Sequence, residues 1–176
     1  MRHPRKLKDN ATYHVTIRAN RREMVLFCTA MRILFLNVVK RAKKKYKFQI
    51  DNFSVMGNHV HLIIRPGKDE SLSRVMQWIL SVFAMAWNRA HFQTGHVWGE
   101  RFFSKIINNC VEFLKTFHYI SQNPVKAQLV KSSEEWEFGG LWHFISGQKE
   151  IIGEPVSWLQ KIYRNYCRIF CPDILK

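Results

Sequence analysis

Apolar and polar residues alternate near the start of the chain in "ATYHVTIRAN", so that Tyr13, Val15 and Ile17 share one face of an extended segment. Successive side chains of a β-strand point to opposite faces. The other face carries His14 and Arg18 among polar neighbours. The pattern therefore predicts a strand with one face in the core and the other in water.

Two later stretches repeat apolar residues at three- and four-residue steps, which is the spacing of one face of a helix. The stripe of the first helix consists of Phe27, Met31, Leu34, Val38 and Ala42. This helix ends in "KRAKKKY", where cations suit the negative end of the helix dipole. Ser71 suits the N-cap of the second helix. The stripe of the second helix consists of Leu72, Val75, Met76, Ile79 and Phe83.

The remaining apolar segments predict three more strands and a third helix. The run "FQIDNFSVMGNHVHLIIRP" indicates a strand pair broken near "MGN", and "VWGERFFSKII" indicates another strand. Asn109 suits the N-cap of the third helix, because Glu112 follows three positions later as in a capping box. Pro124 disfavours the α conformation at Asn123, so this helix should end or kink there. The order of elements is typical of an α+β domain with an antiparallel sheet.

The length of 176 residues is enough for one domain with a proper core. From about Ser132 onward the apolar pattern is weaker, but "WEFGGLWHFI" and "PVSWLQKIYRNYCRIF" are too aromatic for a disordered tail. We therefore predict a main domain over residues 1–131 and an aromatic-rich extension over residues 132–176 that packs on or near it.

Basic residues exceed acidic residues, 28 against 13, which gives a net charge of +15 and a pI near 10.0. Because the excess is spread along the chain, a partner with a phosphate backbone explains it most simply. A solubility charge or a membrane-surface patch is the alternative. The residues that we expect to contact nucleic acid are Arg18, Arg21, Arg22, Trp98, Arg101 and Lys105. Phe102 and Phe103 could also stack on bases, although one of them should face the core.

The four cysteines, Cys28, Cys110, Cys167 and Cys171, show no zinc-finger spacing and are expected to be free thiols. The N-terminal "MRHPRKLKDN" lacks the apolar centre of a signal peptide, and no run approaches the roughly 20 apolar residues of a membrane span. We therefore expect an intracellular protein.

The stretch "GNHVHLII" places His59 and His61 on one face of a strand and Val60 on the other. The two histidines are then about 7 Å apart at Cα. From that distance, two imidazole nitrogens can bind one cation at about 2.0–2.2 Å each. The alternative is a pair of unrelated histidines on a half-exposed strand.

Tyr119 stands apart from the apolar side of the third predicted helix. At about 100° per residue, Phe113, Phe117 and Ile120 fall on one side and Tyr119 falls almost opposite. A core tyrosine should lie with the phenylalanines, so the hydroxyl of Tyr119 is available to a partner. An ordinary surface tyrosine is the alternative.

Four segments together resemble a known family. They are, in order, "YHVTIRANRRE", "GNHVHLIIRP", "GHVWGERFFSK" and "YISQNPVKAQLV", and they cover most of the chain from Tyr13 to Val130. This combination resembles the HUH single-tyrosine transposases, and within them the REP-associated tyrosine transposases. The resemblance implies a ferredoxin-like sheet with the two histidines on a central strand. It also implies binding of imperfect DNA hairpins and cleavage of nearby single-stranded DNA.

Carried over residue by residue, the resemblance implies that His59 and His61 bind a divalent metal, Mg²⁺ or Mn²⁺, and that Tyr119 is the nucleophile. Asn123 matches the polar residue that completes the metal site, and Gln122 is its rival. Tyrosine attack would leave a 5′-phosphotyrosine and a free 3′-hydroxyl. A non-catalytic nucleic-acid-binding module and a metal-dependent hydrolase remain alternatives.

The resemblance also bears on assembly and location. The REP-associated branch favours a monomer, whereas a dimer with exchanged tyrosine helices is possible in the wider superfamily. A bacterial, cytoplasmic and nucleoid-associated protein is expected.

Overall fold

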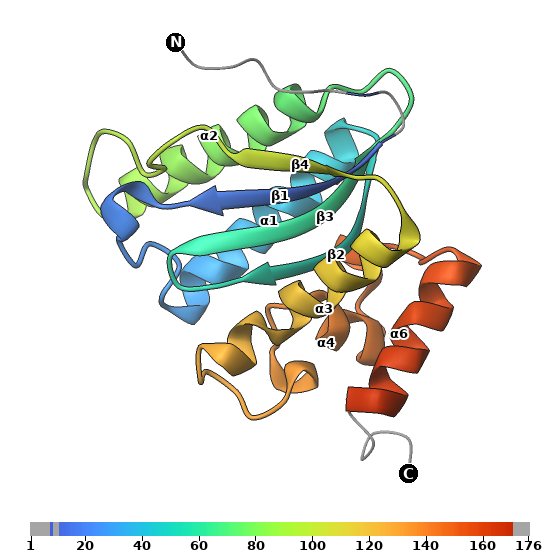
Figure 1. The fold of residues 1–176 in the computed structure, drawn as a ribbon. Helices are drawn as coiled ribbons and strands as arrows, with labels where there is room; N and C mark the ends of the chain where they lie inside the picture. The colour runs from blue at the N-terminus through green and yellow to red at the C-terminus, as the bar shows by residue number, and fades with distance from the viewer. Residues whose placement is uncertain (1–7, 9–10, 171–176) are drawn as a thin grey trace.

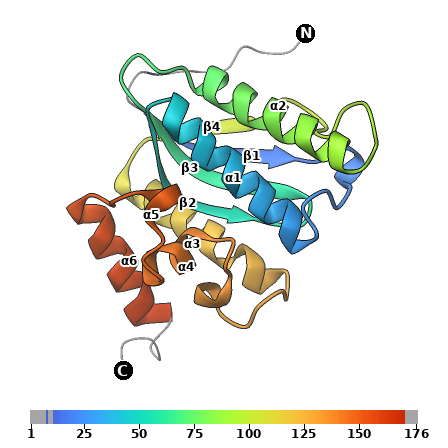
Figure 2. The same cartoon turned by 180° about the vertical axis from the view of Figure 1, so that it is seen from behind.

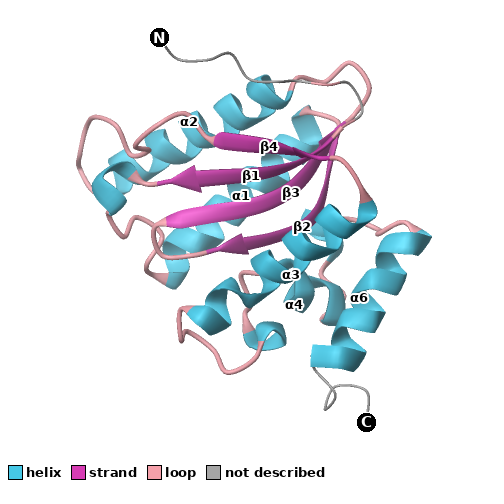
Figure 3. Ribbon diagram, viewed as in Figure 1, coloured by secondary structure: helices cyan, strands magenta, loops and turns pink. Residues whose placement is uncertain are grey.

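Four antiparallel strands form a single sheet in the order β2-β3-β1-β4 (Figure 1). The computed structural model describes residue 8 and residues 11–170. The strands are β1 (Thr12–Arg18), β2 (Phe48–Val55), β3 (His59–Pro66) and β4 (Phe103–Ile107). The predicted α+β class and the ferredoxin-like antiparallel sheet are confirmed, and the His-x-His segment lies on β3, between β2 and β1 (Figure 3).

Helices cover both faces of this sheet. Helices α1 (Thr29–Lys45) and α2 (Leu72–Ala90) lie side by side on one face, as the view from behind shows (Figure 2). Helix α3 (Cys110–Lys126) lies on the opposite face, over β2 and β3. Among the described residues, no helix is both long and apolar enough to cross a bilayer.

A buried asparagine attaches α3 to the sheet. Asn52 of β2 is fully buried at a register shift in the β2–β3 pairing. Its Nδ2 donates to the carbonyl oxygen of Phe117 at 3.2 Å and to the hydroxyl of Ser121 at 3.0 Å. Its Oδ1 accepts from the backbone N–H of Phe53. Because a buried amide is costly without partners, these bonds fix where α3 lies.

The C-terminal segment packs along β2. It comprises η2 (Ser133–Glu135), α4 (Gly140–Ile145), α5 (Lys149–Ile152) and α6 (Ser157–Phe170). The backbone N–H of Val55 donates to the carbonyl oxygen of Phe138, so this segment covers the edge of the sheet. A Cβ on Gly140 would collide with Asn52 Oδ1, so only glycine permits this close approach. The boundary at residue 131 stays a prediction.

Three local predictions differ from the structure in where the element begins or ends. The strand expected over 97–107 begins only at Phe103, because Trp98 turns into the core and donates its indole N–H to the carbonyl oxygen of Leu80. The first helix begins at Thr29, so Phe27 precedes it and is exposed. The third helix continues through Pro124 to Lys126, since a proline in the last turn leaves few helical bonds to break.

Two further predictions concern the cysteines and the N-terminal segment. The described cysteines Cys28, Cys110 and Cys167 are free, and Cys171 lies outside the described residues. Apart from Lys8, the N-terminal "MRHPRKLKDN" also lies outside them.

Replacement of Tyr163 with phenylalanine tests how firmly the C-terminal segment is attached. Tyr163 of α6 is fully buried, its hydroxyl donates to the carbonyl oxygen of Asp51 at 2.8 Å, and its ring packs on Phe117. We expect Tyr163→Phe to lower the free energy of unfolding by about 1–2 kcal/mol, because it leaves a buried carbonyl unsatisfied. Denaturant unfolding measures this, with Tyr46→Phe, at a half-buried ring on Trp78, as the control. Equal stability of both variants would contradict the prediction.

Candidate active site

His59 and His61 lie together under the tyrosine helix. Their ring centroids are 5.0 Å apart. His59 is half-buried, and the exposed fraction of His61 is only 4% because α3 covers that part of β3. The face that the sequence predicts as wet is therefore largely enclosed at this point, and the half-exposed strand is ruled out for His61.

Helix α3 presents Tyr119 directly to this histidine pair. The centroid of the Tyr119 ring lies 5.3 Å from that of His61, with the two rings nearly perpendicular. Phe117 and Ile120 on the same helix are buried, whereas 42% of Tyr119 is exposed. The helical spacing thus separates an anchored face from a ring that reaches solvent. The structure brings Tyr119, His59 and His61 into one site.

A third histidine, which the sequence analysis places only on a polar strand face, belongs to the same cluster. His14 Nε2 of β1 lies 3.1 Å from His61 Nδ1, and its ring centroid lies 6.0 Å from that of Tyr119. Thr16 Oγ1 also lies 3.1 Å from His61 Nδ1. The polar positions in "YHVT" were the sequence signal that could have indicated a role for His14 and Thr16 in the site. Their contact with His61 depends on the register between β1 and β3, which pairs Thr16 with His61.

Hydrogen bonding engages the same nitrogen in both histidines of the pair. His59 Nδ1 lies 2.7 Å from Asn58 Oδ1, and since an amide oxygen only accepts, Nδ1 is the donor. His61 Nδ1 faces His14 and Thr16. In each ring, Nε2 is therefore the nitrogen left for a ligand. Metal-binding histidines commonly show this arrangement, in which the second nitrogen is held by the protein.

The protonation state also suits metal binding. Burial, followed by the charges of His59 and His14, lowers the pKa of His61 to about 3. Burial, and after it the charge of Arg18, also lowers the pKa of His59. Both rings are therefore neutral at pH 7, which is the form of imidazole that binds a metal ion.

The two candidates for a third ligand differ in their surroundings. Gln122 Nε2 donates to the Tyr166 hydroxyl at 2.9 Å and to Ser133 Oγ at 3.2 Å, so the C-terminal segment holds this side chain. Asn123 is half-buried one turn after Tyr119 and donates to the carbonyl oxygen of Tyr119 at 3.0 Å. Within the described part of the chain, no three His, Cys, Asp or Glu side chains are arranged to hold a metal. The hydrogen bond of the Asn123 amide is to Tyr119 and not to either histidine, so Asn123 as third ligand stays a prediction.

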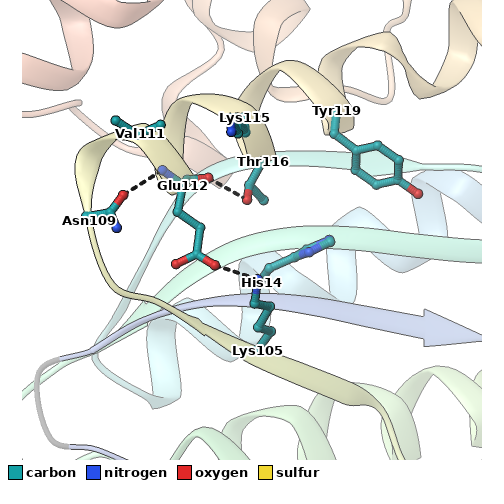
Figure 4. A pocket seen from close by; sticks show the side chains of 8 residues that line it. All are labelled: His14, Lys105, Asn109, Val111, Glu112, Lys115, Thr116 and Tyr119. Carbon is teal, nitrogen blue, oxygen red and sulfur yellow. Dashed lines mark hydrogen bonds and ion pairs between the residues drawn. The ribbon is translucent and has the colours of Figure 1, made fainter.

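A groove of about 660 Å³ leads away from Tyr119 along the first half of α3 (Figure 4). It is lined by His14, Lys105, Asn109, Val111, Glu112, Lys115, Thr116 and Tyr119. Lys105 Nζ lies 2.5 Å from a carboxylate oxygen of Glu112. The groove is open and carries a lysine from β4 and another from α3, of which Lys105 is paired with Glu112. Such lysines can contact the phosphates of an extended anionic chain.

The residues predicted to contact nucleic acid differ in how exposed they are. Arg18 is exposed opposite His59 in the strand register, and Lys105 lies in the groove. Arg21, Arg22 and Arg101 are exposed at the surface. Trp98 is instead packed, since its ring lies 5.2 Å from Phe83 and 6.3 Å from Phe35. Trp98 is only partly buried, and its stacking on bases stays a prediction. In the pair beside Arg101, Phe102 is buried and Phe103 is exposed.

Comparison with known proteins adds three findings. The family described as "Transposase IS200 like" matches residues 7–123. A REP-associated tyrosine transposase of Escherichia coli (strain K12) is 27% identical over 128 residues, which cover 72% of this chain and 74% of that protein. A solved structure of a REP-associated tyrosine transposase bound to a REP hairpin is 23% identical, with a TM-score of 0.71 over 90% of both chains. At this identity, the solved structure shows a shared fold.

The burial of His61 predicts a pH-dependent stability of the metal-free protein. The unfolded chain takes up a proton on His61 near pH 6.5, whereas the folded chain does so only near pH 3. The free energy of unfolding should therefore fall as the pH drops below 6.5, by about 2 kcal/mol at pH 5 from this group. Denaturant unfolding at pH 5 and pH 7.5 measures the effect.

The variant His61→Asn should show a clearly smaller difference between the two pH values. His91→Asn is the control, since His91 is exposed and should keep the wild-type pH dependence. An unchanged pH dependence in His61→Asn would show that His61 titrates normally.

Proposed function

Because the chain belongs to the IS200-like transposase family, we propose that it binds an imperfect DNA hairpin and cleaves and rejoins a nearby single strand through Tyr119. The observation that carries the proposal is the position of Tyr119, whose partly exposed ring lies against the buried His61. The relative whose structure contains a REP hairpin supports the choice of substrate.

In this reaction, the phenolic oxygen of Tyr119 attacks the scissile phosphorus and the bond to the 3′-oxygen breaks. The phenol gives up its proton, and the departing 3′-oxygen takes one up. The products are a 5′-phosphotyrosine and a 3′-hydroxyl, and attack by a 3′-hydroxyl restores a phosphodiester. One phosphate ester replaces another at each step, so neither water nor ATP is needed.

His59 and His61, with Asn123 as third ligand, would hold a divalent cation through Nε2 of each ring and the amide oxygen. Such an ion would neutralise charge on the scissile phosphate. The donors fit an ion of this kind, because both imidazoles are neutral and their Nδ1 atoms are engaged elsewhere. Imidazole ligands suit Mn²⁺ better than Mg²⁺. Asn123 is favoured over Gln122 because the C-terminal segment already holds Gln122.

The groove beside Tyr119 is the proposed path of the single strand. Lys105 and Lys115 would contact its phosphates on either side of the groove. Arg18 and the Arg21–Arg22 turn lie at the end of the sheet where β3 begins, close to His59, and would contact the flanking DNA. Within a single chain, Tyr119 already lies against His61, which supports action as a monomer.

Tyr119→Phe tests the nucleophile. The change removes only the phenolic oxygen from a partly exposed ring, so we expect a stability change well under ~1 kcal/mol and near-normal hairpin affinity. Cleavage of a labelled single strand with Mn²⁺ or Mg²⁺ should be lost, and no covalent protein–DNA adduct should appear on a denaturing gel. Tyr46→Phe should cleave normally. Cleavage without an adduct by the phenylalanine variant would favour a hydrolase, and no cleavage by the wild type would favour a binding module.

His59→Ala and His61→Ala test the metal. We expect each to abolish metal-dependent cleavage and to weaken Mn²⁺ binding, because each removes one of two nitrogen donors. Hairpin affinity in EDTA should change less than about threefold, because His61 is buried and neither imidazole is among the side chains proposed to contact DNA phosphates. His91→Ala is the matched control. An equal loss of hairpin binding and cleavage would argue against a metal-binding role.

A further inference from the structure

The side chain of Asn58 connects His59 to a separate turn of the chain. Asn58 is half-buried in the short connection between β2 and β3. Its Oδ1 lies 2.7 Å from His59 Nδ1, and its Nδ2 donates to the carbonyl oxygen of Arg22 at 3.2 Å. Both the oxygen and the nitrogen of this amide are therefore hydrogen-bonded, and the oxygen accepts from a proposed metal ligand.

The turn that receives this amide has an unusual backbone. Arg21 and Arg22 have φ values of 47° and 59°, although neither is glycine. The left-handed region is unfavourable for residues other than glycine, and such conformations persist only where the surroundings enforce them. The turn therefore presents the Arg22 carbonyl to Asn58 in a backbone conformation that is itself unfavourable.

The backbone around Asn58 is held as firmly as its side chain. Its carbonyl oxygen accepts from the N–H of Ala19, and the carbonyl oxygen of Gly57 accepts from the N–H of Leu26, each at 2.9 Å. A Cβ on Gly57 would collide with Met24, which indicates how closely the two segments approach. These bonds fix the backbone from which the Asn58 side chain reaches His59.

We propose that Asn58 is a positioning residue that holds His59 with Nδ1 protonated and Nε2 free, using the Arg21–Arg22 turn as its anchor. The proposal deepens the proposed function, since it assigns to Asn58 the orientation of one metal ligand. An imidazole without such a partner can exchange its proton between the two nitrogens and rotate about its side-chain bonds. Removal of a partner of this kind typically weakens metal affinity 10- to 100-fold.

Two substitutions separate this role from general destabilisation. Asn58→Ala removes both hydrogen bonds, whereas Asn58→Asp keeps an oxygen that accepts from His59 Nδ1 and loses the donor to Arg22. Asn88→Ala is the matched control, because Asn88 is a partly exposed asparagine whose Nδ2 also donates to a backbone carbonyl, that of Gly95.

The first measurement is the tautomer of His59 in metal-free protein, from long-range ¹H–¹⁵N spectra assigned with the His59→Ala variant. The second is Mn²⁺ affinity without DNA. In Asn58→Ala, we expect a mixed tautomer and Mn²⁺ binding weakened by about tenfold or more. Asn58→Asp keeps the acceptor for His59 Nδ1 but loses the bond to the turn, so it should keep the Nδ1–H form and bind Mn²⁺ more tightly than Asn58→Ala and more weakly than wild type. Asn88→Ala should match wild type.

The proposal is overturned if Asn58→Ala keeps the wild-type tautomer and Mn²⁺ affinity, or if Asn58→Asp fares no better than Asn58→Ala while remaining folded. Neither measurement depends on Tyr119 or on cleavage. Should wild-type protein fail to bind Mn²⁺, the metal role in the proposed function is wrong, and the tautomer measurement still decides the role of Asn58.

Discussion

The hydrogen bonds from buried Asn52 to α3 are the interaction on which the site depends. They reach the carbonyl oxygen of Phe117 and the hydroxyl of Ser121, and Tyr119 lies midway between these two residues. Any shift of α3 along the sheet would leave the Asn52 amide unsatisfied in the interior, which is costly. The same attachment places Tyr119 over His61 and excludes water from that imidazole. The position of the proposed nucleophile and the neutrality of the proposed ligand therefore have one cause.

The site combines neutral histidines with positively charged side chains around them. The cationic charges of Lys105 and Arg18, near His14 and His59 respectively, oppose protonation of those histidines and also attract a phosphate. A protonated imidazole would bind phosphate but not a metal ion. Burial and neighbouring cations thus keep the metal-binding form available in a protein whose net charge of +15 favours DNA.

The sequence predicts those parts of the structure that depend on local periodicity. Alternation and helical spacing suffice for β1, β3 and the two faces of α3, including the separation of Tyr119 from Phe117 and Ile120. Local periodicity does not predict contacts that depend on strand register. For this reason the sequence indicates only that His14 is on a polar strand face, and not that it is a neighbour of His61. The packing of Trp98 had no local signal, because its partners Phe35 and Phe83 come from distant helices. The C-terminal segment has no long periodic stretch before α6, so its packing along β2 had no local signal.

The central claim is that Tyr119 forms the covalent bond to DNA within the site built by β3 and α3. Peptide mass spectrometry of the adduct trapped with a single-stranded substrate tests it most directly. Trypsin should release "TFHYISQNPVK", residues 116–126, which contains one tyrosine. We predict that this peptide carries the nucleotide through a phosphate ester on Tyr119. Attachment of the nucleotide to any other residue would contradict the account.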